Sequence, residues 1–158
     1  MASNLVWKLT GGAANASLSA SLGGTVSSVA VSGSPMNNLF PNVTASQATA
    51  GLTDYRAFDL VNTGDAAAVG TLLWFDAETS STDTTLQFGL DALDSSLSIA
   101  DGLTAPVGIS FSEPNAGAPL NVGDIPAGHG FRVWFKRIVT AGAANTSSDL
   151  ATFTWEYA

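Results

Sequence analysis

The chain of 158 residues contains no cysteine and one histidine, and it has few charged residues and no long hydrophobic run. Without cysteine there can be no disulfide, no thiolate zinc site and no cysteine nucleophile. No stretch approaches the ~18 consecutive apolar residues of a membrane-spanning helix, and the first residues do not resemble a signal peptide. We therefore expect a protein that is synthesised in soluble form in the cytoplasm.

Basic residues are also scarce. The chain has 5 lysines and arginines and 13 aspartates and glutamates, which gives a formal net charge of −8. Such a chain is repelled by phosphate backbones and by anionic lipid headgroups. Nucleic acid and membranes are therefore not expected as partners. Charged residues make up only 11% of the chain, so small and neutral polar residues must cover most of the surface.

Apolar residues make up 46% of the chain, which at this length is enough for one domain with a substantial core. Short runs of β-branched and aromatic residues alternate with polar residues between clusters of glycine, asparagine, aspartate and proline. We predict an all-β fold with little helix, a single antiparallel β-sandwich domain over residues 1–158, of jelly-roll or immunoglobulin-like type. Residues 1–51 are expected to include an extended arm or a long loop, since residues 33–51 contain two prolines.

Alternation with a period of two assigns the strands and their buried faces. The predicted strands are Leu5–Leu9, Leu18–Leu22, Val26–Val31, Tyr55–Val61, Ala68–Phe75, Thr85–Leu90, Val107–Phe111, Leu120–Ile125, Phe131–Val139 and Ala151–Tyr157. The polar turn at residues 62–65 predicts that the strands on either side of it form a hairpin. The residues expected in the core between the sheets are Trp7, Phe58, Trp74, Phe88, Phe131 or Trp134, and Phe153 or Trp155, and Val107, Ile109 and Phe111 are expected to share a buried face.

Few residues offer catalytic or metal-binding chemistry. His129 lies between two glycines in a turn, without the second histidine of a zinc protease or the serine motif of a hydrolase. Its simplest interpretation is a partly exposed turn residue. The alternatives are a catalytic role or a metal-binding role, the latter with an ion shared where three subunits meet. Two loops carry carboxylates, Asp76, Glu78 and Asp83 in one and Asp91, Asp94 and Asp101 in the other. The first set could hold calcium and the second could include a catalytic pair, but solvated loops are the simpler interpretation, and we predict no catalytic residue, no cofactor and no metal.

Trp134 is the strongest candidate for an interface. The odd-numbered residues from Phe131 to Phe135 are apolar and are predicted to face the core, which would place Arg132, Trp134 and Lys136 on the opposite, exposed face. Tryptophan and arginine exposed together are typical of binding hot spots. In the alternative, the strand is inverted and Trp134 is buried.

Several short motifs follow one another in an order that resembles that of small β-sandwich virion proteins of tailed bacteriophages. They are Leu9-Thr-Gly-Gly12, Ala16-Ser-Leu18, Leu22-Gly-Gly24, Asn38-Leu-Phe40, Thr53-Asp-Tyr-Arg56, Val61-Asn-Thr63, Val122-Gly-Asp-Ile-Pro-Ala-Gly128 and Val133-Trp-Phe-Lys-Arg137. The resemblance covers most of the chain, consists of turns and strands, and includes no catalytic residue. Many of those proteins carry a histidine after the Asn-Thr turn, where this chain has Gly64, so the resemblance assigns no role to that turn.

The resemblance implies a virion part that works by assembly and not by catalysis. We expect a capsid decoration or cement protein that binds the head exterior and stabilises contacts between major capsid subunits, as a homo-oligomer (trimer or dimer), after synthesis in the bacterial host cytoplasm. The alternatives are a sandwich associated with the tail, baseplate or fibre, a carbohydrate-binding module for host attachment, and an enzyme. An exposed groove of tryptophan and tyrosine would favour glycan binding, whereas aromatic residues in the core would favour cement.

Overall fold

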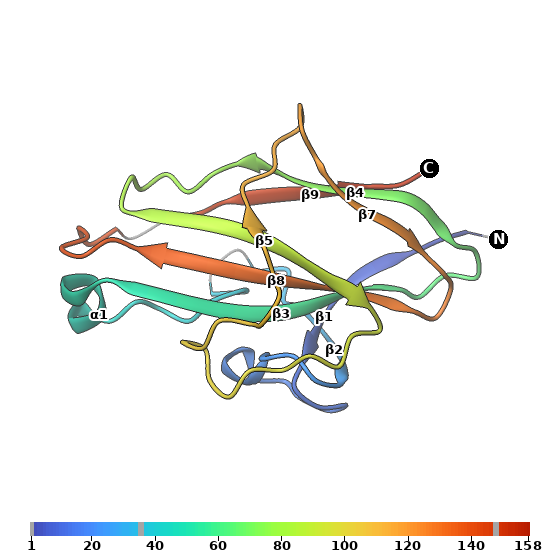
Figure 1. The fold of residues 1–158 in the computed structure, drawn as a ribbon, viewed down its shortest axis with the longest axis horizontal. Helices are drawn as coiled ribbons and strands as arrows, with labels where there is room; N and C mark the ends of the chain where they lie inside the picture. The colour runs from blue at the N-terminus through green and yellow to red at the C-terminus, as the bar shows by residue number, and fades with distance from the viewer. Residues whose placement is uncertain (1, 35–36, 147–148) are drawn as a thin grey trace.

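The computed structural model describes residues 2–34, 37–146 and 149–158 and shows two β-sheets packed against each other (Figure 1). The large sheet has six strands in the order β2-β1-β3-β8-β5-β6, and the small sheet has three in the order β7-β4-β9. The strands are β1 Leu5–Thr10, β2 Val26–Ala30, β3 Leu52–Asn62, β4 Ala68–Ala77, β5 Thr84–Leu93, β6 Phe111–Ser112, β7 Leu120–Ile125, β8 Gly130–Val139 and β9 Thr152–Glu156. All neighbouring strands in the two sheets pair antiparallel. The predicted all-β sandwich with little helix is confirmed.

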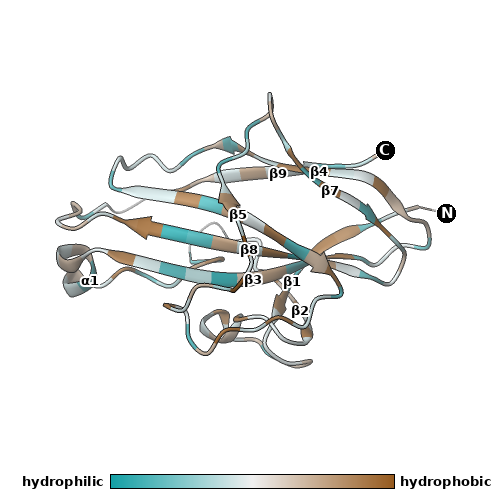
Figure 2. Ribbon diagram, viewed as in Figure 1, coloured by the Kyte–Doolittle hydropathy of each residue, from teal (hydrophilic) through white to brown (hydrophobic). Residues whose placement is uncertain are grey.

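The two longest neighbouring strands, β3 and β8, form the centre of the large sheet. Figure 2 shows hydrophilic and hydrophobic residues alternating along both of them. Because successive side chains of a strand point to opposite faces, Phe58 of β3 lies in the core cluster while its neighbour Asp59 points to the other face. The face of the large sheet that points away from the small sheet is called the outer face below.

Aromatic rings fill the space between the two sheets. Phe88 of β5 stacks on Phe75 of β4 with ring centroids 4.0 Å apart. Phe153 of β9 packs against Phe135 of β8 at 5.4 Å and against Trp7 of β1 at 5.8 Å. Each such pair contributes about 0.5–1.5 kcal/mol beyond the burial of its surface. These contacts place β4 over β5, and β9 over β8 and β1.

Most of the predicted core is confirmed, with one clear exception. The predicted residues found within the core or packed against it are Trp7, Phe58, Phe88, Phe131, Phe153 and Trp155. The prediction for Trp74 is wrong. Its neighbours Leu73 and Phe75 point into the core, so Trp74 points away from the sandwich, where its indole N–H donates to Asp76 at 2.8 Å.

The predicted hairpin is wrong as well, because β3 and β4 belong to different sheets. The buried Asn62 shows why the chain crosses over here. Its amide donates to the carbonyls of Ala66 at 2.7 Å and Ile125 at 2.9 Å, and its oxygen accepts the N–H of Gly64 at 3.0 Å. These bonds fix a corner at which the chain passes from one sheet to the other. The residues of this corner are as polar as those of a hairpin turn, so the sequence does not distinguish the two.

The first third of the chain differs from expectation at two places. Leu18–Leu22 is not a strand, because Leu18–Ala20 forms one turn of 3-10 helix. Within the expected irregular connection, Ala45–Ala50 forms the helix α1, which begins with a capping box between Thr44 and Gln47. No helix within the described ranges is long and apolar enough to cross a membrane.

The strand predicted at Val107–Phe111 is also wrong. Only Phe111–Ser112 pairs with β5, as β6, and residues 94–110 form a long connection that crosses the outer face of the large sheet (Figure 1). Val107 is 85% exposed. Its neighbour Gly108 has φ +79°, a conformation that interrupts a strand.

Candidate functional site on the outer face of the large sheet

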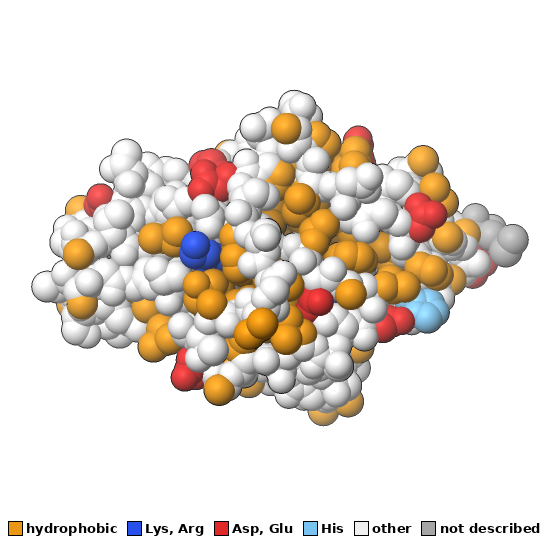
Figure 3. Space-filling model, in the orientation of Figure 1, with side chains coloured by type: hydrophobic (Ala, Val, Ile, Leu, Met, Phe, Trp, Pro, Cys, Tyr) orange, Lys and Arg blue, Asp and Glu red, His pale blue; other side chains and the backbone are white. Residues whose placement is uncertain are grey.

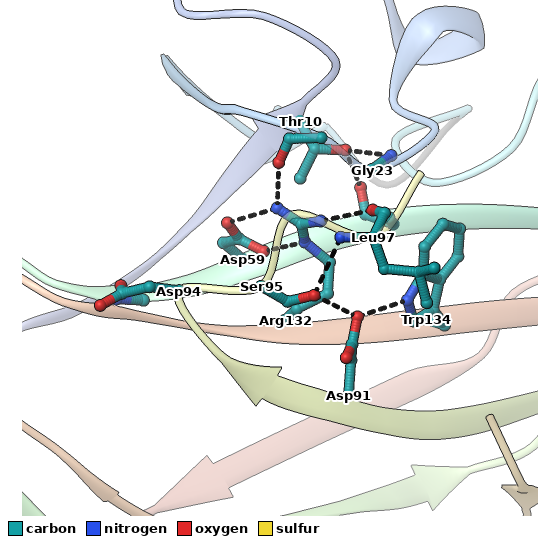
Figure 4. Close-up of polar contacts among 12 residues, drawn as sticks. Thr10, Gly23, Asp59, Asp91, Asp94, Ser95, Leu97, Arg132 and Trp134 are labelled. Atoms are coloured by element: carbon teal, nitrogen blue, oxygen red, sulfur yellow. Dashed lines mark hydrogen bonds and ion pairs between the residues drawn. The ribbon is translucent and has the colours of Figure 1, made fainter. Parts of the chain in front are cut away.

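A buried ion pair lies at the centre of the outer face. Arg132 of β8 stands opposite Asp59 of β3, and its guanidinium donates to both carboxylate oxygens, with Nη2 3.0 Å from Oδ2 (Figure 4). The same guanidinium donates to the carbonyls of Leu97 at 2.9 Å and Gly24 at 2.7 Å. Burial raises the pKa of Asp59, and the hydrogen bonds and charge of Arg132 lower it only in part.

A second polar contact joins the neighbouring strands. The indole N–H of Trp134 donates to Asp91 of β5 at 3.2 Å, and the same carboxylate oxygen accepts the hydroxyl of Ser95 at 2.6 Å (Figure 4). Trp134 is fully buried. Asp91 therefore links the sheet to the segment that covers it.

Two segments, residues 21–24 and residues 94–110, cover these side chains. They pair with each other, since the N–H of Gly24 donates to the carbonyl of Leu97 at 2.9 Å. Gly23 is required for the close approach, because it has φ +88° and a Cβ at this position would lie 2.1 Å from the Leu97 oxygen.

Residues 94–110 are anchored to the sheet at further points. The carbonyl of Gly102 accepts the N–H of Tyr55 at 2.8 Å, on the edge of β3 beyond the end of β1. Further along, Ile109 rests on Gly89 of β5, where an added Cβ would lie 2.3 Å from the Ile109 Cγ2 atom. The connection is therefore a fixed part of the fold.

The expectation that Arg132 and Trp134 face solvent is wrong, because both are 0% exposed. The strand is not inverted, since Val133 and Phe135 lie in the core as predicted. The two covering segments bury the opposite face, and alternation within one strand carries no information about them. Only Lys136 remains partly exposed, with its ammonium nitrogen 5.6 Å from the centre of the Phe111 ring.

A cleft of about 470 Å³ opens beside the ion pair. Asp59 and Val61 of β3 line it together with residues 24–26 and 94–96 and with the glycines of the turn that precedes β8. Its lining is composed mainly of small and polar residues. It exposes one further titratable group, Asp94.

Asp94 and His129 form a pair at this cleft, with His129 Nδ1 2.5 Å from Asp94 Oδ2 and both side chains about half exposed. The other carboxylate oxygen accepts the N–H of Gly130 at 3.1 Å. Burial alone would raise the pKa of Asp94, but the bonds from His129 and Gly130 outweigh it and bring the pKa below its ordinary value. Within the described residues no hydroxyl group is bonded to His129, so the pair lacks an adjacent nucleophile there.

The remaining carboxylates do not gather into one site. Asp76 accepts bonds from Trp74 and Thr154, and Asp83 accepts the N–H of Ala144 at 3.0 Å. Asp101 accepts the N–H of Leu103 at 2.9 Å. In the described part of the chain, no group of three or more histidine, aspartate or glutamate side chains is placed to hold a metal ion.

The most prominent feature of this face is an apolar tip on the covering connection, formed by Leu103, Ala105 and Val107. Leu103 is 65% exposed and Val107 is 85% exposed. The tip is held at two points, because Gly102, which precedes it, is bonded to β3, and Pro106, between Ala105 and Val107, is buried. Gly102, Pro106 and Gly108 indicate a turn in this part of the sequence. Apolar residues within such a turn are the signal that could have identified an exposed tip.

The face that carries this tip has few exposed basic side chains (Figure 3). Two of the five basic side chains, Arg56 and Arg132, are buried, and Arg137 is largely buried and forms two hydrogen bonds with Asp54. On the face drawn in Figure 3, acidic side chains are spread widely and basic ones occupy one small area. A partner for this surface must therefore be neutral or basic where it faces the carboxylates.

Few aromatic side chains of the described residues are strongly exposed. Tyr157, at 36%, is the one aromatic residue among the large exposed hydrophobics of the described ranges. Most of the other rings lie in the core or pack against it.

No protein-family model matches the chain, and no curated protein and no solved structure matches it. A proposal for its function therefore depends on the residues and geometry described above.

Proposed function

We propose that the chain is a structural component of a tailed bacteriophage particle, a decoration or cement protein that binds the outer surface of the head and stabilises contacts between major capsid subunits. The observation that carries this proposal is the apolar tip at Leu103, Ala105 and Val107. The order of motifs along the sequence supports the phage assignment by resemblance. A homo-oligomer on the head surface is part of the same proposal.

The tip has the physical properties of a docking element. It is anchored at Gly102 and Pro106, so little conformational entropy is lost when it is covered. Large exposed apolar side chains in an acidic and polar surface are a common mark of a contact site. The buried ion pair and the indole bond beneath it hold the covering connection in place.

Binding to heads tests the proposal. The purified chain is titrated onto undecorated heads assembled from the major capsid protein of the genome that encodes it. The double variant Leu103→Ser with Val107→Ser should bind at least about 30-fold more weakly, the equivalent of about 2 kcal/mol for a hot spot. Its thermal unfolding should be unchanged, because both side chains are exposed.

The matched control is Val69→Ser with Leu150→Ser, which removes the same two kinds of side chain at positions 48% and 50% exposed elsewhere. This control should bind heads like the wild type. Equal binding by both double variants would show that the tip is not the contact. Failure of the wild type to bind heads at any concentration would overturn the proposed function itself.

A further inference from the structure

We propose that the free edge of β9 accepts an extended segment of a partner protein as an additional strand, and that this segment carries basic residues beside alternating apolar ones. The inference does not depend on the function proposed above. It rests on a comparison of the edges of the two sheets. An edge strand presents unpaired N–H and C=O groups, and native proteins normally protect such edges.

The other edges are protected. Residues 12–13 cover β2, because the N–H of Gly12 donates to Thr25 at 3.1 Å and the N–H of Ser28 donates to the carbonyl of Ala13 at 2.9 Å. The edge strand β6 has only two residues. In β7, Gly123 has φ +88° and the pairing with β4 is interrupted by two register shifts, which is a usual way to blunt an edge.

The edge strand β9 is less protected. It contains no glycine, proline or lysine. Its pairing with β4 shifts register only at its first residue, between Phe75 and Ala77, and is regular from Phe153 opposite Phe75 to Glu156 opposite Leu72. No backbone hydrogen bond to another described residue covers its far side. Half of the N–H and C=O groups of such a strand point away from its one neighbour, so β9 offers a template for pairing.

The inward side chains of β9 point to the same conclusion. Phe153 and Trp155 contact Trp7 in the core, yet both remain partly exposed. A strand placed beside them would complete their burial. Trp7 packs against both rings, and its buried indole N–H has no acceptor within the described part of the chain.

Charge selects the kind of segment. The three strands of the small sheet contain Asp76, Asp124 and Glu156 and no lysine or arginine. An added strand with basic residues is therefore attracted, whereas an acidic one is repelled. Valine- or threonine-rich segments suit the pleated surface and its inward apolar side.

A second copy of the chain fits the free edge of β9 less well than an extended segment does. Since β9 lies over β1, the large sheet extends beyond it by β2. Antiparallel pairing of β9 with its equivalent would place both large sheets on the same side, and the two overhanging β2 strands would meet. Each copy also carries a net charge of −8. A single extended segment avoids both conflicts.

The probe is a synthetic peptide of about nine residues that alternates valine and threonine and has a lysine at each end. Amide chemical shifts of the full chain are recorded as it is added. We expect changes concentrated at residues 152–156 and slower hydrogen exchange there. The same peptide with proline at two internal positions should not bind, because proline cannot donate to a strand ladder.

A matched pair of charge reversals tests the site. Glu156→Lys should weaken binding of the lysine peptide by about fivefold, as expected for a charge at the rim of a contact. Glu113→Lys makes the same change beside β6 and should leave the affinity unchanged. Shift changes at another edge, equal effects of the two variants, binding of the proline peptide, or a dimer of the free chain that protects residues 152–156 from hydrogen exchange would each overturn the inference.

Discussion

The indole N–H of Trp134 donates to the carboxylate of Asp91 at 3.2 Å, although both side chains lie on the face of the large sheet that points away from its core. The pair is shielded by the connection from β5 to β6, to which Asp91 is joined through Ser95. This face therefore behaves as a second interior. The first two predictions address its stability.

Truncating the buried indole should destabilise the fold. Trp134→Ala is expected to lower the free energy of unfolding by about 3–5 kcal/mol, as for other large side chains removed from an interior. Trp134→Phe keeps most of the ring but loses the bond to Asp91 and should cost roughly 1–3 kcal/mol. Urea unfolding measures both. If Trp134→Ala unfolded like the wild type, the burial of this residue would be contradicted.

Removing one partner of the buried ion pair should destabilise the fold more than replacing both partners by apolar residues. Arg132→Met leaves Asp59 buried without its partner and should cost about 3–5 kcal/mol, whereas Arg132→Met combined with Asp59→Leu should recover part of that loss. Burial raises the pKa of Asp59, and Arg132→Met removes the hydrogen bond and charge that lower it. This variant should therefore lose stability as the pH rises through the folded-state pKa of Asp59, because the ionised carboxylate is then isolated. A double variant no more stable than Arg132→Met alone would argue against this account.

Adding a side chain at Gly89, on which Ile109 rests, should weaken the attachment of the covering connection to the sheet. Gly89→Ala places a Cβ 2.3 Å from Ile109 Cγ2, so the connection must move away, at a cost of about 1–3 kcal/mol. Hydrogen exchange at residues 97–109 should become faster. Gly33→Ala is the control, because nothing lies within 4 Å of a Cβ at that position. Unchanged exchange in Gly89→Ala would mean that Ile109 does not anchor the connection.

The pair between Asp94 and His129 should make stability fall in acid. The pKa of Asp94 is lowered in the folded chain, so its contribution is present above the unfolded value of about 3.9 and is lost as the pH falls through the folded value. The difference in unfolding free energy between the wild type and Asp94→Asn should therefore shrink between about pH 5 and about pH 2. His129→Ala should weaken this dependence. If this difference in unfolding free energy instead grew as the pH fell, the pKa of Asp94 would be raised in the folded chain, and the prediction would be wrong.

The alternation of apolar and polar residues predicted most strands and their core-facing residues correctly. The core-facing residues follow the same pattern whether the opposite face of the strand is exposed to solvent or covered by another segment, so the pattern does not tell these two cases apart. Phe131–Val139 is an example, since its core residues were correct and the exposure of Trp134 was not. The covering depends on Leu97 and Gly24, which lie far from β8 in the chain. The corner at Asn62 escaped prediction for a related reason, since its bond to Ile125 joins distant segments.

The pairing of β3 with β8 also sets an order of events during synthesis. Leu52 pairs with Val139, so the middle strand of the large sheet leaves the ribosome long before its partner has been translated. At roughly 5–20 residues per second, the interval lasts several seconds. For that time the nascent chain holds β3 with one side unpaired and with Asp59 lacking its arginine, so the net charge of −8, which makes chains repel one another, is an advantage before the fold exists.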